Sequence, residues 1–343
     1  MKTYYILLLL LISSISQAQI VNIPDANFKN ALVNELVVDT DANGWPDSVA
    51  DFNGDGEIQL TEAESIFWLK VRGFDIVSME GIQSFTSLEY LDCANNTIST
   101  IDLTQNINLT RLHCNYNNLE ALDVSYNTNL QRLYCGNNNL TAIDITQNTV
   151  LAELSCWNNN ISTLELSQNP DLYFFDCGDN NITSLDLSVN SNLDGIFCYD
   201  NPLVDLNIKN GNNANISQLH VYGTPFLCIQ VDDVNYANNK VCDMTDDWGW
   251  CKDFNDVYSE DCENLSIDES LQLEFSLFPN PTQNTLFIES QLPIETVKIY
   301  NLQGQLIKEV SSNNIDVSQL SSGLYFAQVT VNGKSETKKF IKN

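Results

Sequence analysis

Residues 130–140 read Leu130-Gln-Arg-Leu-Tyr-Cys135-Gly-Asn-Asn138-Asn-Leu140, and this pattern returns every 21 residues. A cysteine ends each apolar run, an asparagine follows three residues later, and an apolar residue follows two after that. One coil of this length cannot bury its own apolar face, but stacked coils bury a continuous core. The pattern therefore predicts a solenoid. The six repeated cysteines are Cys93, Cys114, Cys135, Cys156, Cys177 and Cys198.

Two further columns follow the same period. Each asparagine stands where the chain must turn after a strand, and stacked amides can satisfy backbone groups of neighbouring coils. The second half of each coil alternates as in Leu122-Asp123-Val124, which predicts a second parallel sheet on the opposite side. Its acidic column indicates a solvated face more than cation binding, although weak binding stays open. The column contains Asp102, Asp123, Asp144, Glu165 and Asp186.

The consensus L-x-x-L-x-C-x-x-N-x-L resembles the leucine-rich repeat family. Residues 69–88 resemble an internalin-type repeat, and Ile216, Leu219 and Val221 continue the register, giving roughly eight coils. The predicted fold class is mainly β. It is a leucine-rich repeat solenoid with a small helical calcium-binding N-terminal cap, followed by a C-terminal antiparallel β-sandwich.

The repeated cysteines occupy an inward position, where a free cysteine acts as a small buried hydrophobe. Neighbouring coils lie ~4.8 Å apart, which is close enough for disulfides, but parallel inward Cβ vectors conflict with the required dihedral. A linear column also supplies no tetrahedral metal site. We therefore expect these cysteines to be reduced core residues.

Side chains between the inward positions point onto the exposed sheet, where several aromatic and basic residues are neighbours. Exposed aromatics beside polar groups are typical anchors for a protein or glycan ligand. The alternative is that the rings only cover the sheet and fill gaps between coils. The candidate ligand-binding residues are Tyr90, Arg111, His113, Arg132, Tyr134, Trp157, Phe174, Phe197 and Tyr199.

Residues 51–62 fit the EF-hand loop, in which oxygen ligands alternate around a glycine at the sharp turn. The expected calcium ligands are Asp51, Asn53, Asp55, Glu57 through its carbonyl, Gln59 and Glu62. An acidic, glycine-rich turn without metal is the alternative. Upstream, residues 39–47 resemble another calcium loop through Asp39, Asp41, Asn43 and Asp47, but Ala50 replaces the terminal carboxylate.

Two helices are expected around these loops. Asp25 can cap one helix, whose apolar face contains Phe28, Ala31, Leu32 and Leu36. Thr61 and Glu64 resemble the capping box of another. Together these helices would close the first coil.

The ends of the chain carry targeting signals. Residues 1–18 combine Lys2, a short apolar run and Ser16-Gln17-Ala18, which predicts a cleaved signal peptide. That run is too short to span a bilayer, and no second long one follows, so we expect no transmembrane segment in the mature chain. Export favours oxidised cysteines.

Residues 276–343 resemble the C-terminal sorting domain of the type IX secretion system. The similarity rests on Leu277-Phe-Pro-Asn-Pro-Thr282, Val297 to Gly304, Ile315 to Leu320, Gly323-Leu-Tyr325 and Lys338 to Lys342. It implies type IX secretion machinery as a partner and a location that is secreted or attached to the outer cell surface. Such domains are usually removed after export.

Four cysteines lie outside the repeat, and their spacing leaves three pairings and a zinc site open, although export disfavours zinc. The segments 227–233 and 259–262 resemble the C-terminal cap of secreted Bacteroidetes leucine-rich repeat proteins. That resemblance implies the pairs Cys228 with Cys262 and Cys242 with Cys251.

The predicted domains are a signal peptide (1–18), an N-terminal cap (19–66), a solenoid (67–227), a C-terminal cap (228–262), a linker (263–275) and the sorting domain (276–343). The charge divides along the same lines. The net charge is −30, yet residues 276–343 contain six basic and five acidic residues. Residues 19–275 contain eight basic and forty acidic residues, a balance of −32.

This charge excludes nucleic acid and anionic lipid as partners, because both require clustered Lys and Arg. No nucleophile-elbow, zincin, P-loop or dinucleotide motif is present, so we do not expect an enzyme. The sequence predicts an adhesin-like binding protein that recognises an extracellular protein or glycan, with calcium as its cofactor. The alternative is a structural, calcium-dependent surface-layer or biofilm component without a single ligand.

Overall fold

The computed structural model describes residues 19–243, 248–262, 275–290, 293–331 and 334–343. The predicted signal peptide, and all of the predicted linker except Phe275, lie outside the described residues. The chain divides into two compact units, residues 1–262 and 263–343. Each unit is described by itself.

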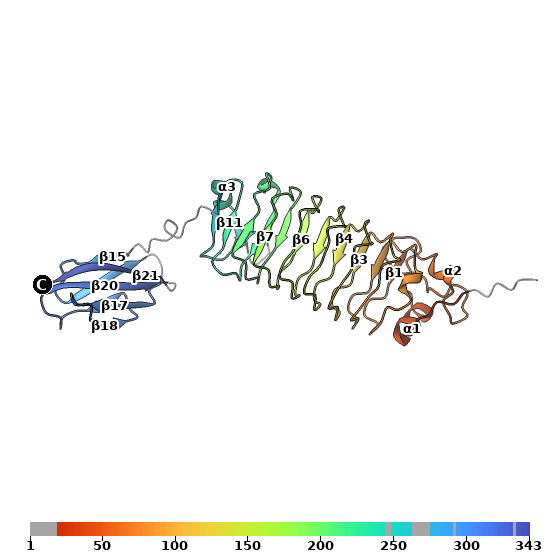
Figure 1. Ribbon diagram of the computed structural model, residues 1–343, viewed down its shortest axis with the longest axis horizontal. Helices are drawn as coiled ribbons and strands as arrows, with labels where there is room; N and C mark the ends of the chain where they lie inside the picture. Colours follow the sequence, from red (N-terminus) through yellow and green to blue (C-terminus); the bar gives the residue numbers. More distant parts are fainter. Residues whose placement is uncertain (1–18, 244–247, 263–274, 291–292, 332–333) are drawn as a thin grey trace, which may run out of the picture. The chain divides into compact units, whose positions relative to one another are not determined.

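The first unit is a solenoid whose coils stack through a ten-stranded sheet, visible as the row of short arrows in Figure 1. The strand order is β1-β2-β3-β4-β5-β6-β8-β10-β13-β12, and every pairing is parallel except β12 with β13. The coils therefore follow one another along the sheet in sequence order. The strands are β1 (Trp68–Lys70), β2 (Tyr90–Asp92), β3 (Arg111–His113), β4 (Arg132–Tyr134), β5 (Glu153–Ser155), β6 (Phe174–Asp176), β8 (Gly195–Phe197), β10 (Gln218–Val221), β12 (Cys242–Asp243) and β13 (Trp248–Lys252).

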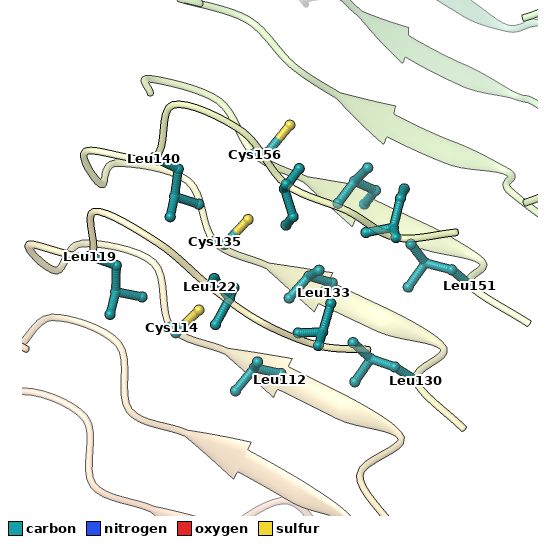
Figure 2. Close-up of a cluster of buried hydrophobic side chains, with 14 of the residues drawn as sticks. Leu112, Cys114, Leu119, Leu122, Leu130, Leu133, Cys135, Leu140, Leu151 and Cys156 are labelled. Carbon is teal, nitrogen blue, oxygen red and sulfur yellow. The ribbon is translucent and has the colours of Figure 1, made fainter. Parts of the chain in front are cut away.

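The middle residue of each short strand points inward and the flanking residues point outward, as the alternation of a strand requires. Leu91, Leu112, Leu133 and Leu154 stand in register and are fully buried. The leucines and cysteines of successive coils form one core (Figure 2). All six repeated cysteines are free and buried, in agreement with the predicted core role.

The asparagine after each cysteine joins its own coil to the preceding coil, as Asn138 illustrates. Its Nδ2 donates to the carbonyl oxygens of Cys135 at 2.9 Å and Cys114 at 3.1 Å, and its Oδ1 accepts from the Leu119 N–H at 3.0 Å. The prediction that this column satisfies neighbouring backbone groups is confirmed. Equivalent bonds recur at Asn117, Asn159 and Asn180.

The second sheet is shorter than predicted. It has the order β14-β11-β9-β7 and belongs to the last coils, with β7 (Ser184–Asp186), β9 (Asp205–Asn207), β11 (Cys228–Gln230) and β14 (Val257–Ser259). In earlier coils the equivalent segments form no strand. There the carbonyl of Val124 accepts from the Asn148 side chain at 3.0 Å. A second asparagine column thus bonds carbonyls that a ladder would otherwise use.

The N-terminal end is closed by α1 (Ala26–Asn34) and α2 (Leu60–Ala63), and a 3₁₀ turn, η1 (Ile82–Ser84), follows in the first coil. Asp25 caps α1, because its Oδ1 accepts from the N–H groups of Asn27 and Phe28 at 2.9 Å. Phe28, Ala31 and Leu32 are buried as predicted. Leu36 was assigned wrongly, since α1 ends before it and its side chain is 61% exposed.

The capping box was also placed wrongly. The cap residue of α2 is Gln59, whose N–H donates to Glu62 Oε2 at 2.9 Å. The predicted Thr61 and Glu64 lie within α2 and at its C-terminal end. The Glu62 carboxylate therefore points back toward the loop, where it accepts from the N–H groups of Asn53 and Gln59.

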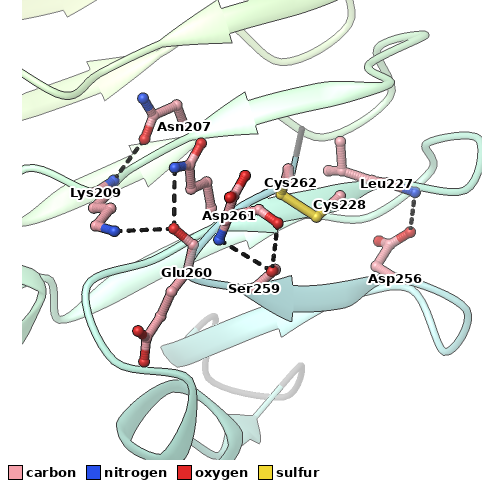
Figure 3. Close-up of a disulfide and its surroundings, with 10 residues drawn as sticks. Asn207, Lys209, Leu227, Cys228, Asp256, Ser259, Glu260, Asp261 and Cys262 are labelled. Atoms are coloured by element: carbon pink, nitrogen blue, oxygen red, sulfur yellow. Dashed lines mark hydrogen bonds between the residues drawn. A yellow bond between two sulfur atoms is a disulfide. The ribbon is translucent and has the colours of Figure 1, made fainter. Parts of the chain in front are cut away.

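The C-terminal end of the solenoid contains η2 (Asn213–Asn215), α3 (Val234–Asn238) and two disulfides. Cys228 pairs with Cys262 and Cys242 pairs with Cys251, as the family resemblance implies. Figure 3 shows the first bond beside Asp256, whose carboxylate accepts from the Leu227 N–H at 3.0 Å. The disulfide of Cys228 fastens residue 262, the last of this unit, to β11 of the second sheet.

The second unit consists of two antiparallel sheets, β15-β16-β19 and β18-β17-β20-β21. Residues of both sheets, such as Leu286, Val297 and Phe340, form one buried cluster. The strands are β15 (Phe275–Phe278), β16 (Thr285–Ser290), β17 (Thr296–Tyr300), β18 (Leu306–Val310), β19 (Asn314–Asp316), β20 (Gly323–Val331) and β21 (Lys334–Lys342).

Candidate ligand-binding face

The outward residues of the ten-stranded sheet form two rows in strand register and a third row just after the strands. The first row contains four of the candidate residues and also Trp68. The second contains three of them and also Lys70 and His220. The first row contains Trp68, Tyr90, Arg111, Arg132, Glu153 and Phe174. The second contains Lys70, Asp92, His113, Tyr134, Ser155, Asp176, Phe197 and His220.

The candidate residues fall into two groups along these rows. Toward the N-terminal end, rings contact in sequence from Trp68 to Tyr90 (5.5 Å between centroids), Tyr90 to His113 (5.1 Å) and His113 to Tyr134 (4.5 Å, stacked). The Tyr90 hydroxyl and His113 Nδ1 share a hydrogen bond of 3.0 Å. Burial raises the pKa of Tyr90 to about 12 and lowers the pKa of His113, so both are neutral near pH 7.

Basic residues gather at the same end of the face. Lys70, Arg72, Arg111 and Arg132 make up half of the eight Lys and Arg residues between positions 19 and 262. The Arg111 guanidinium lies over the Trp68 ring at 5.5 Å, which is a favourable cation–π contact. This end is therefore an amphipathic surface on an otherwise acidic unit.

Glu153 separates the two groups of rings. Its carboxylate accepts hydrogen bonds from the hydroxyls of Tyr134 and Tyr173, and Arg132 Nε lies 3.0 Å from its Oε1. Glu153 itself is only 6% exposed. A buried charge that is paired and hydrogen-bonded in this way fixes the orientation of its neighbours.

The third row follows the repeated cysteines, and its glycines determine how its rings lie. It contains Ala94, Asn115, Gly136, Trp157, Gly178 and Tyr199. A Cβ on Gly136 would meet the Trp157 ring at 2.5 Å, and one on Gly178 would meet the Tyr199 ring at 2.4 Å. Each ring thus lies flat over the glycine of the preceding coil. Trp157 also contacts Tyr116 edge-on at 5.7 Å.

The predicted aromatics do lie on the outward face, but they are not freely exposed. Tyr90 is buried, and Tyr134, Trp157, Phe174, Phe197 and Tyr199 are half-buried against one another. Sequence reasoning omitted Trp68, Tyr173, His220 and Tyr222. The first and third belong to coils with irregular spacing, so extending the outward rows through Leu69 and Leu219 would have found them.

The acidic column on the other side has a structural role at several coils. Asp102 Oδ1 accepts from the N–H of Thr104 at 3.0 Å, and Asp144 Oδ1 accepts likewise from Thr146. These hydrogen bonds hold the pKa of both carboxyls below its usual range. The column therefore stabilises turns that return the chain to the next coil.

The predicted calcium loop is closed at both ends by buried carboxylates. Asp51 accepts from the N–H groups of Gly54 and Gly56, both at 2.8 Å, and Glu62 accepts from the Asn53 N–H at 3.0 Å. Glu57 instead turns its carboxylate to Lys29 at 2.6 Å, which leaves its backbone carbonyl as the oxygen it can offer the loop. Among the described residues, no three acidic, histidine or cysteine side chains already form a metal cluster.

Loop 39–47 has similar hydrogen bonds but different surroundings. Asp39 accepts from the N–H groups of Asn43 and Gly44, as Asp51 does in the second loop. However, Lys70 donates to the Gly44 carbonyl, and its Nζ lies 3.8 Å from Asp39 Oδ2. Asp39 is buried, so the Lys70 ammonium is its counter-charge.

Comparison with known families identifies the second unit. Residues 276–343 match the secretion system C-terminal sorting domain family, the same residues that the sequence indicated. The chain therefore carries a type IX sorting domain, and the protein is secreted or attached to the outer cell surface. No curated protein matches the chain.

Three solved structures from Listeria monocytogenes resemble the chain. The functional domain of InlJ, described as including a cysteine ladder, is 24% identical, with 67% of this chain and 64% of that chain covered and a TM-score of 0.27. Internalin C2 is 23% identical, with 66% and 95% covered and a TM-score of 0.44. Internalin InlF is 20% identical, with 66% and 76% covered and a TM-score of 0.38.

Within the described ranges, no helix has the length and apolar character needed to cross a membrane.

Proposed function

We propose that the outward face of the ten-stranded sheet binds an extracellular protein or glycan, and that the chain is a non-catalytic, adhesin-like recognition protein. The observation that carries this proposal is the run of rings from Trp68 to Tyr222 along one face. Rings and arginines are the side chains most enriched where binding energy concentrates. The contacts with Glu153 and the glycines hold these rings in place before a ligand arrives, which lowers the entropy cost of binding.

The test is capture from glycan and extracellular-protein arrays by the recombinant chain. The double variant Tyr134→Ala and Trp157→Ala should lose at least about tenfold in affinity for whatever the wild type captures. A matched control is Tyr126→Ala with Trp45→Ala, because both side chains are exposed and lie outside the sheet rows. Equal capture by the double variant would show that the ligand does not bind at this face. Calcium-dependent assembly without capture would favour the surface-layer alternative.

We also propose that residues 51–62 hold one calcium ion. The loop offers carboxylates from Asp51, Asp55 and Glu62, amide oxygens from Asn53 and Gln59, and the Glu57 carbonyl. This mixed oxygen set suits a hard cation. Hydrogen bonds from the Glu57 N–H and the Gln59 amide lower the pKa of Asp55, so this ligand is ionised at neutral pH.

Loop 39–47 is proposed not to take a second ion. The Lys70 ammonium already contacts the Asp39 carboxylate and the Gly44 carbonyl, and a divalent cation there would be repelled by it. The predicted stoichiometry is therefore one calcium per chain. Lys70 also lies 5.2 Å from the Tyr90 ring, so it connects this loop to the binding face.

A further inference from the structure

A cavity of about 270 Å³ opens on the C-terminal part of the binding face. It lies between outward residues of β6, β8 and β10, which are consecutive strands of the sheet. Such a volume is below the ~300–1,000 Å³ of pockets that hold drug-sized ligands, so it suits a single side chain. Its lining consists of Phe174, Asp176, Phe197, Tyr199, His220 and Tyr222.

The walls of the cavity are aromatic. Phe174 and Phe197 lie 5.5 Å apart between centroids, and Phe197 lies 4.9 Å from the His220 ring. Tyr199 and Tyr222 stack at 5.5 Å with an interplanar angle of 13°. Aromatic rings attract a cation that lies over their faces, so a cluster of rings favours a cationic group.

One wall carries the Asp176 carboxylate, to which no described lysine or arginine supplies a counter-charge. Asp176 accepts only long hydrogen bonds, from Ser155 Oγ at 3.3 Å and the Gly178 N–H at 3.2 Å. In the described parts of the chain, no Lys or Arg forms an ion pair with Asp176, and the charge that raises its pKa is another acid, Asp179. Burial raises the pKa of Asp176 to about 6, which is the expected result for a carboxyl without a cation beside it.

We propose that this cavity binds the ammonium or guanidinium group of a basic side chain presented by a protein partner. The inference rests on the proposed binding function of the face and names the ligand chemistry at one end of it. A cation would supply the counter-charge that Asp176 lacks and would contact the surrounding rings. Residues 19–275, which comprise this unit and the segment after it, carry a balance of −32 and would also attract a basic partner from a distance.

The experiment uses small probes in place of the unidentified partner. Saturation-transfer NMR on the full chain measures binding of Nα-acetyl-arginine methylamide and Nα-acetyl-lysine methylamide. The same amide of Nε-acetyl-lysine is a neutral isostere, and methyl glucoside tests for a sugar. The expected result is binding of the two cations, with at least about tenfold weaker binding of both neutral probes.

Two substitutions separate the cavity from general charge attraction. Asp176→Asn should weaken cation binding at least about tenfold, whereas Asp179→Asn, which removes the same charge from an exposed neighbour, should change it less than about twofold. Equal loss in both variants, equal binding of the neutral probes, or tighter binding of methyl glucoside would overturn the proposal. Asp176→Asn is expected to fold at least as stably as the wild type, so loss of binding cannot be attributed to unfolding.

The outcome is distinguishable from failure of the binding face itself. If a captured protein depends on Tyr134 and Trp157 but Asp176→Asn binds the cationic probes normally, the proposed function stands and the cation site is wrong. If the probes bind as predicted but capture is unaffected by Tyr134→Ala and Trp157→Ala, the cation site stands and the wider face is wrong.

Discussion

Gly136 shows how one missing side chain shapes the binding face. Its backbone is not in the left-handed region, so alanine there is conformationally permitted, and only the contact with Trp157 opposes it. We predict that Gly136→Ala displaces the indole ring, lowers the free energy of unfolding by about 1–3 kcal/mol and shifts tryptophan emission. Urea denaturation followed by fluorescence measures both effects. In a Trp157→Ala background the same substitution should leave the free energy of unfolding almost unchanged. A loss of stability that persists there would mean that the added methyl group clashes with something other than Trp157.

Asp176 makes the folding stability fall as the pH rises, which is the opposite of the usual effect of an aspartate. Its folded pKa is about 6, whereas an unfolded Asp titrates near ~3.9. The folded state therefore holds this proton more tightly, and the group's contribution to stability is present below pH ~4 and is lost as the pH rises through 6. The Asp179 carboxylate also raises this pKa by charge repulsion.

We predict that Asp176→Asn raises the free energy of unfolding at pH 7.5 by on the order of 1 kcal/mol and has no such effect at pH 4. Thermal unfolding across this pH range measures the difference, with Asp179→Asn as the control. A variant that is destabilised at pH 7.5 would mean that the carboxylate is stabilised by a contact other than those described.

At the scale of elements, the two asparagine columns are not equivalent. Asn138 uses both ends of its amide, whereas the Asn148 amide nitrogen bonds two carbonyls and its Oδ1 is buried without a hydrogen-bond partner. The column of Asn148 therefore buries an amide oxygen without a hydrogen bond, which lowers stability, whereas the column of Asn138 does not.

We predict that Asn138→Ala lowers the free energy of unfolding by about 1–3 kcal/mol, because the buried Leu119 N–H loses its partner. The carbonyls of Cys114 and Cys135 each lose one of two asparagine donors and keep the other. Asn148→Ala should cost less, since the carbonyls of Val124 and Asn127 keep their backbone N–H donors and an unpaired oxygen is removed. Chemical denaturation measures both, and exposed Asn139→Ala is the neutral reference. Equal costs in the two columns would contradict this reading of the hydrogen bonds.

The sequence predicts the long sheet better than the second sheet, because only the inward positions of the long sheet repeat strictly. The inward leucines and cysteines fixed the register of the long sheet, because their period is strict. The strand predicted at Leu122-Asp123-Val124 is absent. Alternating side chains do not show whether the backbone forms hydrogen bonds with a neighbouring strand or with an asparagine amide. A further signal was present but not used. The second residue after each cysteine has positive φ, and all but Tyr116 of these residues are Asn or Asp, which favour that conformation.

The candidate site was predicted only in outline. The outward rows followed from alternation, which placed Tyr134, Phe174 and Phe197 correctly. The cavity beside Asp176 could not be predicted, because it depends on the tilt of rings from three coils and on the irregular coil that supplies His220. Burial of Tyr90 and Glu153 likewise results from packing between coils, which spacing alone does not show.

At the scale of the whole molecule, calcium should act on only one of the two units. Binding to the folded loop alone stabilises by about 2.7 kcal/mol when free calcium is a hundredfold above Kd. We predict that calcium raises the melting temperature of the solenoid unit and leaves that of residues 276–343 unchanged, as two transitions in calorimetry would show. Glu62→Gln should abolish the shift, whereas exposed Glu64→Gln should not. An unchanged transition after chelation would refute the calcium site.

The same titration determines how many ions bind. Isothermal titration calorimetry should give one calcium per chain, and Lys70→Met should allow a second by removing the ammonium from loop 39–47. Two ions in the wild type, or one in Lys70→Met, would show that Lys70 is not the counter-charge of Asp39.

The asparagine bonds have a consequence for how such a chain changes over generations. Each amide reaches back by the same number of residues in the regular 21-residue coils, so one such coil added or removed as a unit restores every bond at the junction. Recombination between neighbouring repeats within the gene could therefore lengthen or shorten the face while both ends keep their caps. New ring patterns could then arise one coil at a time, without any part of the core being redesigned.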